Sequence, residues 1–319
     1  MTHDGRPSWL HELEPVAERL LERHLAVADD WFPHQYVPWS QGRDFDGPLR
    51  GTPWQEAQSA LDPVARDGLV LSVLTEDNLP VYHHQLTHLI GRDGAWGAWL
   101  HRWTAEEDRH STALRSYLHT TRAVEPEALE RARLHHLSTP VAPGDYPEGL
   151  RGLAYVLIQE RATRTSHQSI GLHSNEDVCA RLMSRLAQDE NLHMLFYRDL
   201  YAALFDFQPD HAMAALTATV TDFHMPGRSI PGFATMSTRL ALAGWYGPTT
   251  YLNDVLIPLL RTLRVMERTD LTATGERDRE ALAASLARLR TQAARFEQQQ
   301  QERRERLSQP PRPGNLAYR

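Results

Sequence analysis

Apolar residues recur at intervals of three and four along most of the chain, which is the spacing of one face of an α-helix. No alternation of apolar and polar residues is sustained over four or more positions, so the pattern predicts no strand. The predicted helical segments cover residues 8–28, 62–90, 95–119, 125–137, 146 to before 175, 175–205, 209–223, 233–244, 249–267 and 276–306. We therefore expect an all-α protein, with a single helical domain over residues 1–306 and a flexible C-terminal tail over residues 307–319.

Proline and capping residues predict where several of these helices begin, bend or end. Thr52-Pro53 has the pattern of an N-cap followed by proline at the first helical position, and Asn175 is expected to cap the helix that follows it. Pro80 lies four residues after Glu76, and because proline has no N–H, the carbonyl of Glu76 should lose its helical partner. A kink and a helix end both satisfy this condition. The helix-compatible residues after Pro80 favour one continuous, kinked helix over residues 62–90.

Two copies of a Glu-x-x-His pattern stand out on the predicted helices, at residues 107–110 and 190–193. Residues three apart share a helix face, so each Glu and His can reach one metal ion together. A lone candidate glutamate precedes each copy by about thirty residues, Glu76 in the first case and Glu160 in the second. That interval allows an antiparallel helical hairpin whose ligands lie at one height. Two Glu-x-x-His pairs and two single glutamates form the ligand set of a di-iron carboxylate bundle.

Composition narrows the chemistry and the location. The 319 residues contain a single cysteine, Cys179, which excludes an intrachain disulfide and a thiolate metal cluster, and which suits a reducing cytosol. His and carboxylate ligands suit iron or manganese. The net charge of −7 argues against general nucleic-acid binding, and all 34 basic residues are arginine. The sequence shows no signal peptide and no apolar run long enough to span a bilayer, so we expect a cytoplasmic protein.

The metal-binding pattern lies within longer motifs. These are TEDNLP around Glu76, WTAEEDRH around residues 107–110, QERAT around Glu160, DENLH around residues 190–193, and FHMPG at residues 223–227. Together they resemble the soluble acyl-[acyl carrier protein] desaturases of the stearoyl type, over roughly residues 30–300. The segment WFPHQYVPWSQG resembles the bacterial branch of that family. The resemblance implies a ferritin-like di-iron four-helix bundle elaborated with additional helices.

The resemblance also assigns roles to individual residues. It implies one iron held by Glu76, Glu107 and His110, and a second iron held by Glu160, Glu190 and His193, with Glu107 and Glu190 bridging the two. Thr163 matches the threonine on the oxygen-binding side of the cluster. Trp103 and Asp189 match positions on the route for electrons. At Leu192 the family often has a basic residue beside the histidine, which puts one contact around the site in doubt.

The function that the resemblance implies is an O₂-dependent desaturation. Electrons from a ferredoxin would reduce the two iron ions, and a cis double bond would form in an acyl chain carried on acyl carrier protein. The family also implies a homodimer without a membrane span. Because both partners are usually acidic, docking needs a local arginine patch, and Arg161, Arg164 and the helix at residues 285–306 are candidates.

Other functions use similar ligands and remain alternatives. The ligand set also suits another di-iron oxygenase, either a hydroxylase or an N-oxygenase. A small subunit of ribonucleotide reductase is disfavoured because Leu114 stands where its tyrosine is expected. A ferritin-like iron store would self-assemble from a much shorter chain and needs no long C-terminal helical region. A protein that has lost activity and only binds acyl carrier protein would not need an intact ligand set.

Overall fold

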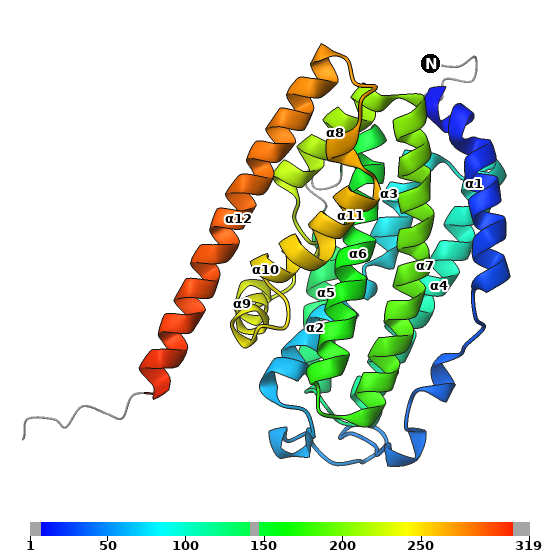
Figure 1. Ribbon diagram of the computed structural model, residues 1–319. Coiled ribbons are helices and arrows are strands. Elements are labelled where there is room, and N and C mark those ends of the chain that lie inside the picture. The colour runs from blue at the N-terminus through cyan, green and yellow to red at the C-terminus, as the bar shows by residue number, and fades with distance from the viewer. Residues whose placement is uncertain (1–7, 141–146, 309–319) are drawn as a thin grey trace, which may run out of the picture.

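The computed structural model describes residues 8–140 and 147–308, and within these ranges the chain forms helices and no strand. Figure 1 shows the helices arranged as an elongated bundle with a layer of C-terminal helices on one side. The main helices are α1 (Ser8–Val27), α2 (Pro63–Glu76), α3 (Leu79–Ile90), α4 (Gly94–Thr120), α5 (Pro126–Ser138), α6 (Gly149–His173), α7 (Asp177–Phe207), α8 (Pro209–Asp222), α9 (Phe233–Ala243), α11 (Ile257–Thr262) and α12 (Ala273–Ser308). The predicted all-α class is confirmed.

The centre of the bundle is formed by α4, α6, α7 and the pair α2–α3, with α1 packed against α4 and α7. The α6–α7 hairpin makes the most extensive of these contacts. Gly171 allows the close approach near its turn, because a Cβ there would lie 2.9 Å from the Cβ of Met183. Large aromatic side chains, including Trp96 and Trp99, are fully buried beside aliphatic residues in the core. The burial of these side chains stabilises the bundle.

The expected continuous helix over residues 62–90 is instead two helices. Glu76 is the last residue of α2, a turn follows, and Pro80 occupies the first turn of α3. Proline is favourable there because the N–H that it lacks would have no helical partner. Asp77, in the turn, is buried and forms ion pairs with Arg115 and Arg133. Those two ion pairs fix the break, so the prediction of a kinked helix was wrong.

The helix expected to begin at Thr52-Pro53 does not form. Thr52 instead pairs with Phe45 in an isolated β-bridge, and residues 56–58 form a single 3₁₀ turn. The helix α2 begins at Pro63, where the Asp62 carboxylate accepts hydrogen bonds from two backbone N–H groups at 2.7 and 3.0 Å. Asp62-Pro63 therefore has the cap-and-proline arrangement that was expected ten residues earlier.

The cap of α7 also differs from the prediction by one residue. Asn175 adopts a left-handed backbone conformation with φ 53° in the turn after α6, which asparagine tolerates better than most residues. The next residue, Glu176, is the N-cap, and its carboxylate accepts hydrogen bonds from the backbone N–H groups of Val178 and Cys179. Like aspartate, a common N-cap residue, glutamate has a carboxylate that accepts these hydrogen bonds, although its side chain is longer by one methylene.

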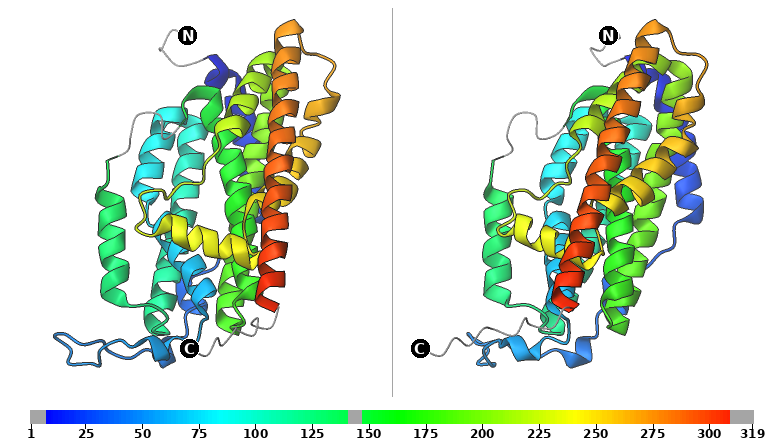
Figure 2. Two further views of the ribbon diagram at one scale, coloured as in Figure 1. Left: turned by 90° about the vertical axis from the view of Figure 1, so that its left-hand side faces the viewer. Right: turned by 60° about the vertical axis from the view of Figure 1, so that its left-hand side comes forward.

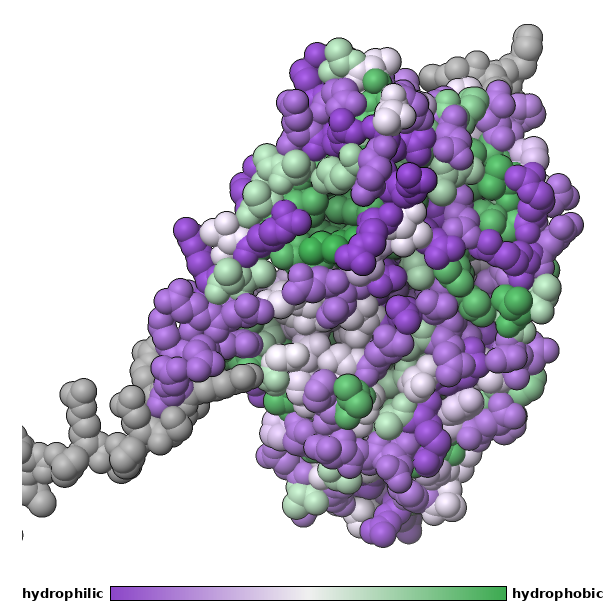
Figure 3. Space-filling view, in the orientation of Figure 1, coloured by the Kyte–Doolittle hydropathy of each residue, from purple (hydrophilic) through white to green (hydrophobic). Residues whose placement is uncertain are grey.

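The C-terminal helices form an outer layer. Helix α12 lies along α8, and Figure 2 shows it running the length of the bundle. Its buried residues, including Leu282 and Leu286, face the bundle while most of its other side chains are exposed. Figure 3 shows a largely hydrophilic face with an apolar area in the hollow between α12 and α11. The last residues of the predicted tail, 309–319, lie outside the described residues.

Within the described residues, no helix is both long enough and apolar enough to cross a membrane.

Candidate metal centre

The structure brings the six predicted ligands together in the middle of the bundle. They form two buried groups, and within each group one ligand atom from every residue lies within 4.8 Å of the others. The first group is Glu76, Glu107, His110 and Glu190, and the second is Glu107, Glu160, Glu190 and His193. Glu107 and Glu190 belong to both groups. This is the arrangement expected of two metal ions that share two bridging carboxylates.

Each ligand comes from a helix whose local geometry directs it inward. The helices α4 and α7 each supply a glutamate and a histidine from one face, three residues apart. Glu160 projects from the middle of α6 into the same space. Glu76 is the last residue of α2, directly before the turn fixed by Asp77. The break between α2 and α3 therefore sets the position of this ligand.

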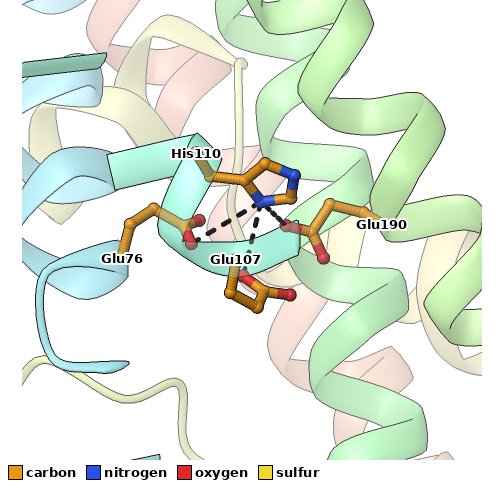
Figure 4. Close-up of side chains that lie close together, drawn as sticks. All are labelled: Glu76, Glu107, His110 and Glu190. Atoms are coloured by element: carbon orange, nitrogen blue, oxygen red, sulfur yellow. Dashed lines mark ion pairs between the residues drawn. The ribbon is translucent and has the colours of Figure 1, made fainter. Parts of the chain in front are cut away.

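In the first group, three carboxylates surround one histidine nitrogen (Figure 4). The Nδ1 atom of His110 lies 3.2 Å from Glu190 Oε1, 3.3 Å from Glu107 Oε2 and 3.9 Å from Glu76 Oε2. The second group repeats this arrangement around His193, whose side chain is also fully buried. Such convergence of anionic oxygens on one imidazole nitrogen is typical of a cation site.

In the second group, the Nδ1 atom of His193 lies 2.9 Å from Glu107 Oε1, 3.5 Å from Glu160 Oε2 and 3.9 Å from Glu190 Oε2. The two bridging glutamates thus present one oxygen to each histidine.

Several of these buried atoms form no hydrogen bond with any described residue. They are the Nδ1 atoms of both histidines, Oε2 of Glu160 and Oε1 of Glu190. Buried polar atoms are ordinarily satisfied, so a group of orphaned ones that face each other needs a partner. A pair of divalent cations bound among them would satisfy every one, and four carboxylates with two imidazoles suit iron or manganese. The residues present therefore fit the metal that the family implies.

The electrostatics of the cluster point the same way. Burial raises the pKa of Glu76 well above its ordinary value, and the nearby carboxylates of Glu107 and Glu190 raise it further. Burial also raises the pKa of Glu190, again with Glu107 adding to the effect. Carboxylates packed this closely in an apolar interior cannot all be ionised without a compensating positive charge. Bound cations would supply that charge.

The other ring nitrogen of each histidine contacts a second carboxylate, and the pairing is crossed between helices. The Nε2 atom of His110, on α4, lies 3.3 Å from Asp189 Oδ2 on α7. The Nε2 atom of His193, on α7, lies 2.9 Å from Glu106 Oε2 on α4. Such partners fix the orientation and tautomer of a ligating histidine. The resemblance implied a role for Asp189 in electron transfer, whereas Glu106 was missed, although an acid precedes the glutamate of the Glu-x-x-His pattern in both motifs.

Asp189 contacts several side chains on one side of the site. Its carboxylate accepts hydrogen bonds from the indole Nε1 of Trp31 at 2.7 Å, from Arg109 at 3.1 Å and from Arg185 at 2.5 Å. Burial opposes its ionisation, but His110 and the Trp31 indole, among other neighbours, lower the pKa of Asp189 to about 2. Trp31 was missed because it lies in an aperiodic loop, where no spacing links it to the motifs.

Glu106 contacts several side chains on the opposite side of the site. It accepts from the imidazole of His24 at 3.0 Å and from Arg102 Nε at 2.6 Å, in addition to His193. His24 comes from α1, 82 residues earlier in the chain, and is buried. No spacing along the chain distinguishes His24 from the other histidines.

Trp103 and Thr163 lie on the cluster's other faces. The indole Nε1 of Trp103 donates a hydrogen bond to Glu160 Oε1 at 3.0 Å, so Trp103 contacts a predicted ligand. The tryptophan that contacts Asp189 is Trp31. Thr163 is buried one turn beyond Glu160, and its hydroxyl accepts a hydrogen bond from Gln159. The roles that the resemblance assigns to Trp103 and Thr163 remain predictions.

Two cavities meet at the cluster. The first, of about 660 Å³, is lined by Glu76, Glu107 and Trp103 together with side chains of α3 and α6. The second, of about 400 Å³, is largely apolar, is lined by Glu76 and Thr163, and extends towards α9 and the C-terminal layer. Both cavities contact Thr75 and Glu76. Cavities therefore extend from the site in two directions.

Comparison with known proteins identifies the family. Residues 6–309 match the model of the fatty acid desaturase family, and the chain belongs to that family, whose members are oxidoreductases. The chain is 42% identical over 304 residues to a protein of Mycobacterium tuberculosis H37Rv named as an acyl-[acyl-carrier-protein] desaturase, DesA1, covering 93% of this chain and 90% of that one.

The chain is also similar to a plant protein and to a solved bacterial structure. The chain is 28% identical over 299 residues to the chloroplastic stearoyl-[acyl-carrier-protein] 9-desaturase 5 of Oryza sativa subsp. japonica, covering 87% of this chain and 75% of that one. The X-ray structure named for the acyl-ACP desaturase DesA2 of Mycobacterium tuberculosis H37Rv superposes with a TM-score of 0.69 at 29% identity, over 82% of this chain and 97% of that chain. The ferritin-like helical fold expected from the motifs is thus confirmed.

Proposed function

We propose that this protein is an O₂-dependent di-iron desaturase that introduces a cis double bond into an acyl chain carried on acyl carrier protein. The observation that carries the proposal is that two cavities meet at a buried double ligand set. A ligand set alone would suit many di-iron enzymes. Two largely apolar cavities that share Glu76 in their walls suit a long aliphatic substrate that passes the site.

Each iron would be held by a histidine and a terminal glutamate, Glu76 with His110 and Glu160 with His193, while Glu107 and Glu190 bridge. Breaking two unactivated C–H bonds offers no handle for acid–base chemistry, and the iron pair supplies the oxidising power when bound. The protein's own residues position the reactants. Asp189 and Glu106 hold the histidines through their outer nitrogens, and Trp103 holds Glu160.

The cavity walls determine where the acyl chain lies. Holding two adjacent methylenes beside the cluster replaces a search in solution with a fixed geometry, which is a large part of the rate enhancement. Thr75 and Glu76 line both cavities, so this is where the chain would pass the metals. The surrounding buried aromatic and aliphatic residues would exclude water from the reacting carbons.

The partners proposed here follow from the same reaction. Acyl carrier protein would present the chain, as the names of the relatives imply for those proteins. A ferredoxin would supply electrons, and a homodimer is the assembly that the family resemblance implies. A contact on the side of the site formed by Trp31, Arg109 and Asp189 would offer an electron donor a hydrogen-bonded path to His110.

The direct test uses iron-loaded protein with ferredoxin, its reductase, O₂ and acyl carrier proteins bearing chains of several lengths. The expected product is an olefin whose double-bond position is fixed relative to the carrier. A hydroxylated product would instead assign the protein to the di-iron oxygenases. If two irons bind and every chain is recovered saturated and unmodified, the desaturase proposal is wrong while the metal site stands.

A further inference from the structure

A separate pocket lies on the outer side of α6, away from the metal ligands. Its volume is about 400 Å³, and it is formed between α6 and residues 244–258. The polar side chains that line it include Arg161, Arg164, Gln168, Thr250 and Asp254. Part of its wall is the π-helical segment Tyr251–Leu256, an irregular form of helix that is frequent at functional sites.

The two arginines of this pocket form no ion pair with a described residue, in contrast to two arginines beside the metal site. Arg109 and Arg185 both pair with the carboxylate of Asp189. Arg164, by contrast, forms no hydrogen bond or ion pair with a described residue, and its Nε is buried. Arg161 donates its Nε to the backbone carbonyl of Asp254 at 2.8 Å and makes no ion pair within the described chain.

Two half-buried guanidinium groups therefore share one pocket, and neither has an ion-pair partner among the described residues. Burial lowers the pKa of Arg164, and burial together with the neighbouring Arg164 lowers the pKa of Arg161. A guanidinium stays protonated in proteins even so. The Asp254 carboxylate lines the pocket but lies outside ion-pair distance of both arginines. The Asp254 carboxylate opposes the fall in the pKa of Arg161 without forming an ion pair. The pocket thus holds two partly desolvated positive charges that one carboxylate compensates only in part, a cost that an oxyanion would offset.

We propose that this pocket binds a phosphate-type oxyanion between Arg161 and Arg164. The planar guanidinium presents paired N–H donors that match phosphate oxygens, and two of them can engage three acceptor oxygens better than they can engage one carboxylate. The Thr250 hydroxyl and the Gln168 amide line the same space and add neutral donors. The bound group can be free phosphate or the phosphate of a larger ligand.

One larger ligand follows from the position of the pocket. The segment 244–250 separates it from the cavity that contains Thr163, since Gly244, Trp245 and Thr250 line the outer pocket while Tyr246, Gly247 and Pro248 line the inner one. A phosphate on a flexible arm, such as the phosphopantetheine arm of acyl carrier protein, would bind here while its far end approaches the inner cavity. This choice of source rests on the proposed function, whereas the phosphate site itself does not.

The test is isothermal titration of iron-loaded, full-length protein with inorganic phosphate, at ionic strength held constant with chloride. We expect saturable binding at one site that is weakened at least about tenfold in Arg164→Gln and in Arg161→Gln, because each variant loses charge-assisted hydrogen bonds. Arg164→Lys keeps the positive charge but lacks the planar, paired N–H donors of the guanidinium, so this variant should bind phosphate with intermediate affinity. Arg181→Gln, on the exposed surface of α7, is the matched control and should bind as wild type does.

Three results would overturn the assignment. The first is no saturable phosphate binding to the wild-type protein, and the second is wild-type affinity in both Gln variants, which would place the phosphate elsewhere, for example on the iron. The third is acetate binding as tight as that of phosphate, which would define a general anion patch. Circular dichroism and thermal unfolding verify that each variant folds.

A second pair of titrations identifies the source of the phosphate. If the carrier's arm is the ligand, 4′-phosphopantetheine should bind at least as tightly as phosphate, and pantetheine should lose that affinity. Phosphopantetheine that binds more weakly than free phosphate would overturn the arm as the source. The titrations measure no turnover. Failure to bind phosphate would therefore not contradict the proposed desaturase activity, and saturated products in the desaturation assay would not contradict phosphate binding.

Discussion

The crossed contacts between the outer carboxylates and the ligand histidines predict that Glu106 controls the affinity of one metal position. Glu106→Gln keeps the size and shape of the side chain and removes its charge. In the wild-type protein, the carboxylate accepts the Nε2–H of His193 at 2.9 Å, which leaves the Nδ1 lone pair directed at the metal position. A glutamine can instead donate its amide to Nε2, so that the proton moves to Nδ1 and blocks ligation.

The magnitude follows from comparable outer partners of metal ligands. Removing such a partner typically lowers metal affinity about 10- to 100-fold, which corresponds to about 1.4–2.8 kcal/mol. The upper part of this range is expected, because Glu106 is buried and also holds His24 at 3.0 Å and Arg102 at 2.6 Å. All three partners would lose the ionised acceptor at once.

The assay is an anaerobic titration with Co²⁺, whose visible spectrum reports each occupied site, followed by Fe²⁺. Asp108→Asn removes the same charge two residues further along α4 from an exposed side chain, and it should bind both ions as the wild type does. Asp189→Asn should weaken the position of His110 and spare that of His193, since the pairing is crossed. Unchanged affinity at both positions in Glu106→Gln would refute the reasoning.

Three further predictions concern the metals, the packing and the pH dependence. Glu190→Ala should lower iron occupancy from two towards zero because it removes a ligand shared by both groups; stoichiometric iron by colorimetric assay in the purified variant would contradict this assignment. Gly171→Ala should lower the free energy of unfolding by about 1–3 kcal/mol in urea denaturation, since its Cβ would meet that of Met183 at 2.9 Å; an unchanged midpoint would show that the helices separate easily. Burial lowers the pKa values of His119 and His136, so the unfolded state binds protons more readily than the folded state. The free energy of unfolding should therefore decrease as the pH falls below about 6.5. A His119→Gln, His136→Gln double variant should lose less stability between pH 7 and 5 than the wild type, and an equal loss would contradict the prediction.

The sequence by itself was sufficient to predict the helical class and the six side chains that come together in two buried groups, for a physical reason. The Glu-x-x-His spacing corresponds to one turn of helix, so residues 107–110 and 190–193 must each share a face wherever their helices lie. The intervals from Glu76 and Glu160 correspond to the length of a helical hairpin, which brings each pair of ligands to one height. Periodicity is a local property, and local properties can be read from a single chain.

Only the tertiary structure decided what surrounds those ligands. His24 and Trp31 contact Glu106 and Asp189 across 82 and 158 residues of sequence, from a first helix and a loop that no period relates to the motifs. The end of α2 at Glu76 likewise depends on Asp77 meeting arginines from α4 and α5. Such contacts are set by how whole helices pack, and the free energy that selects them comes from the bundle core and not from the spacing of residues along one helix.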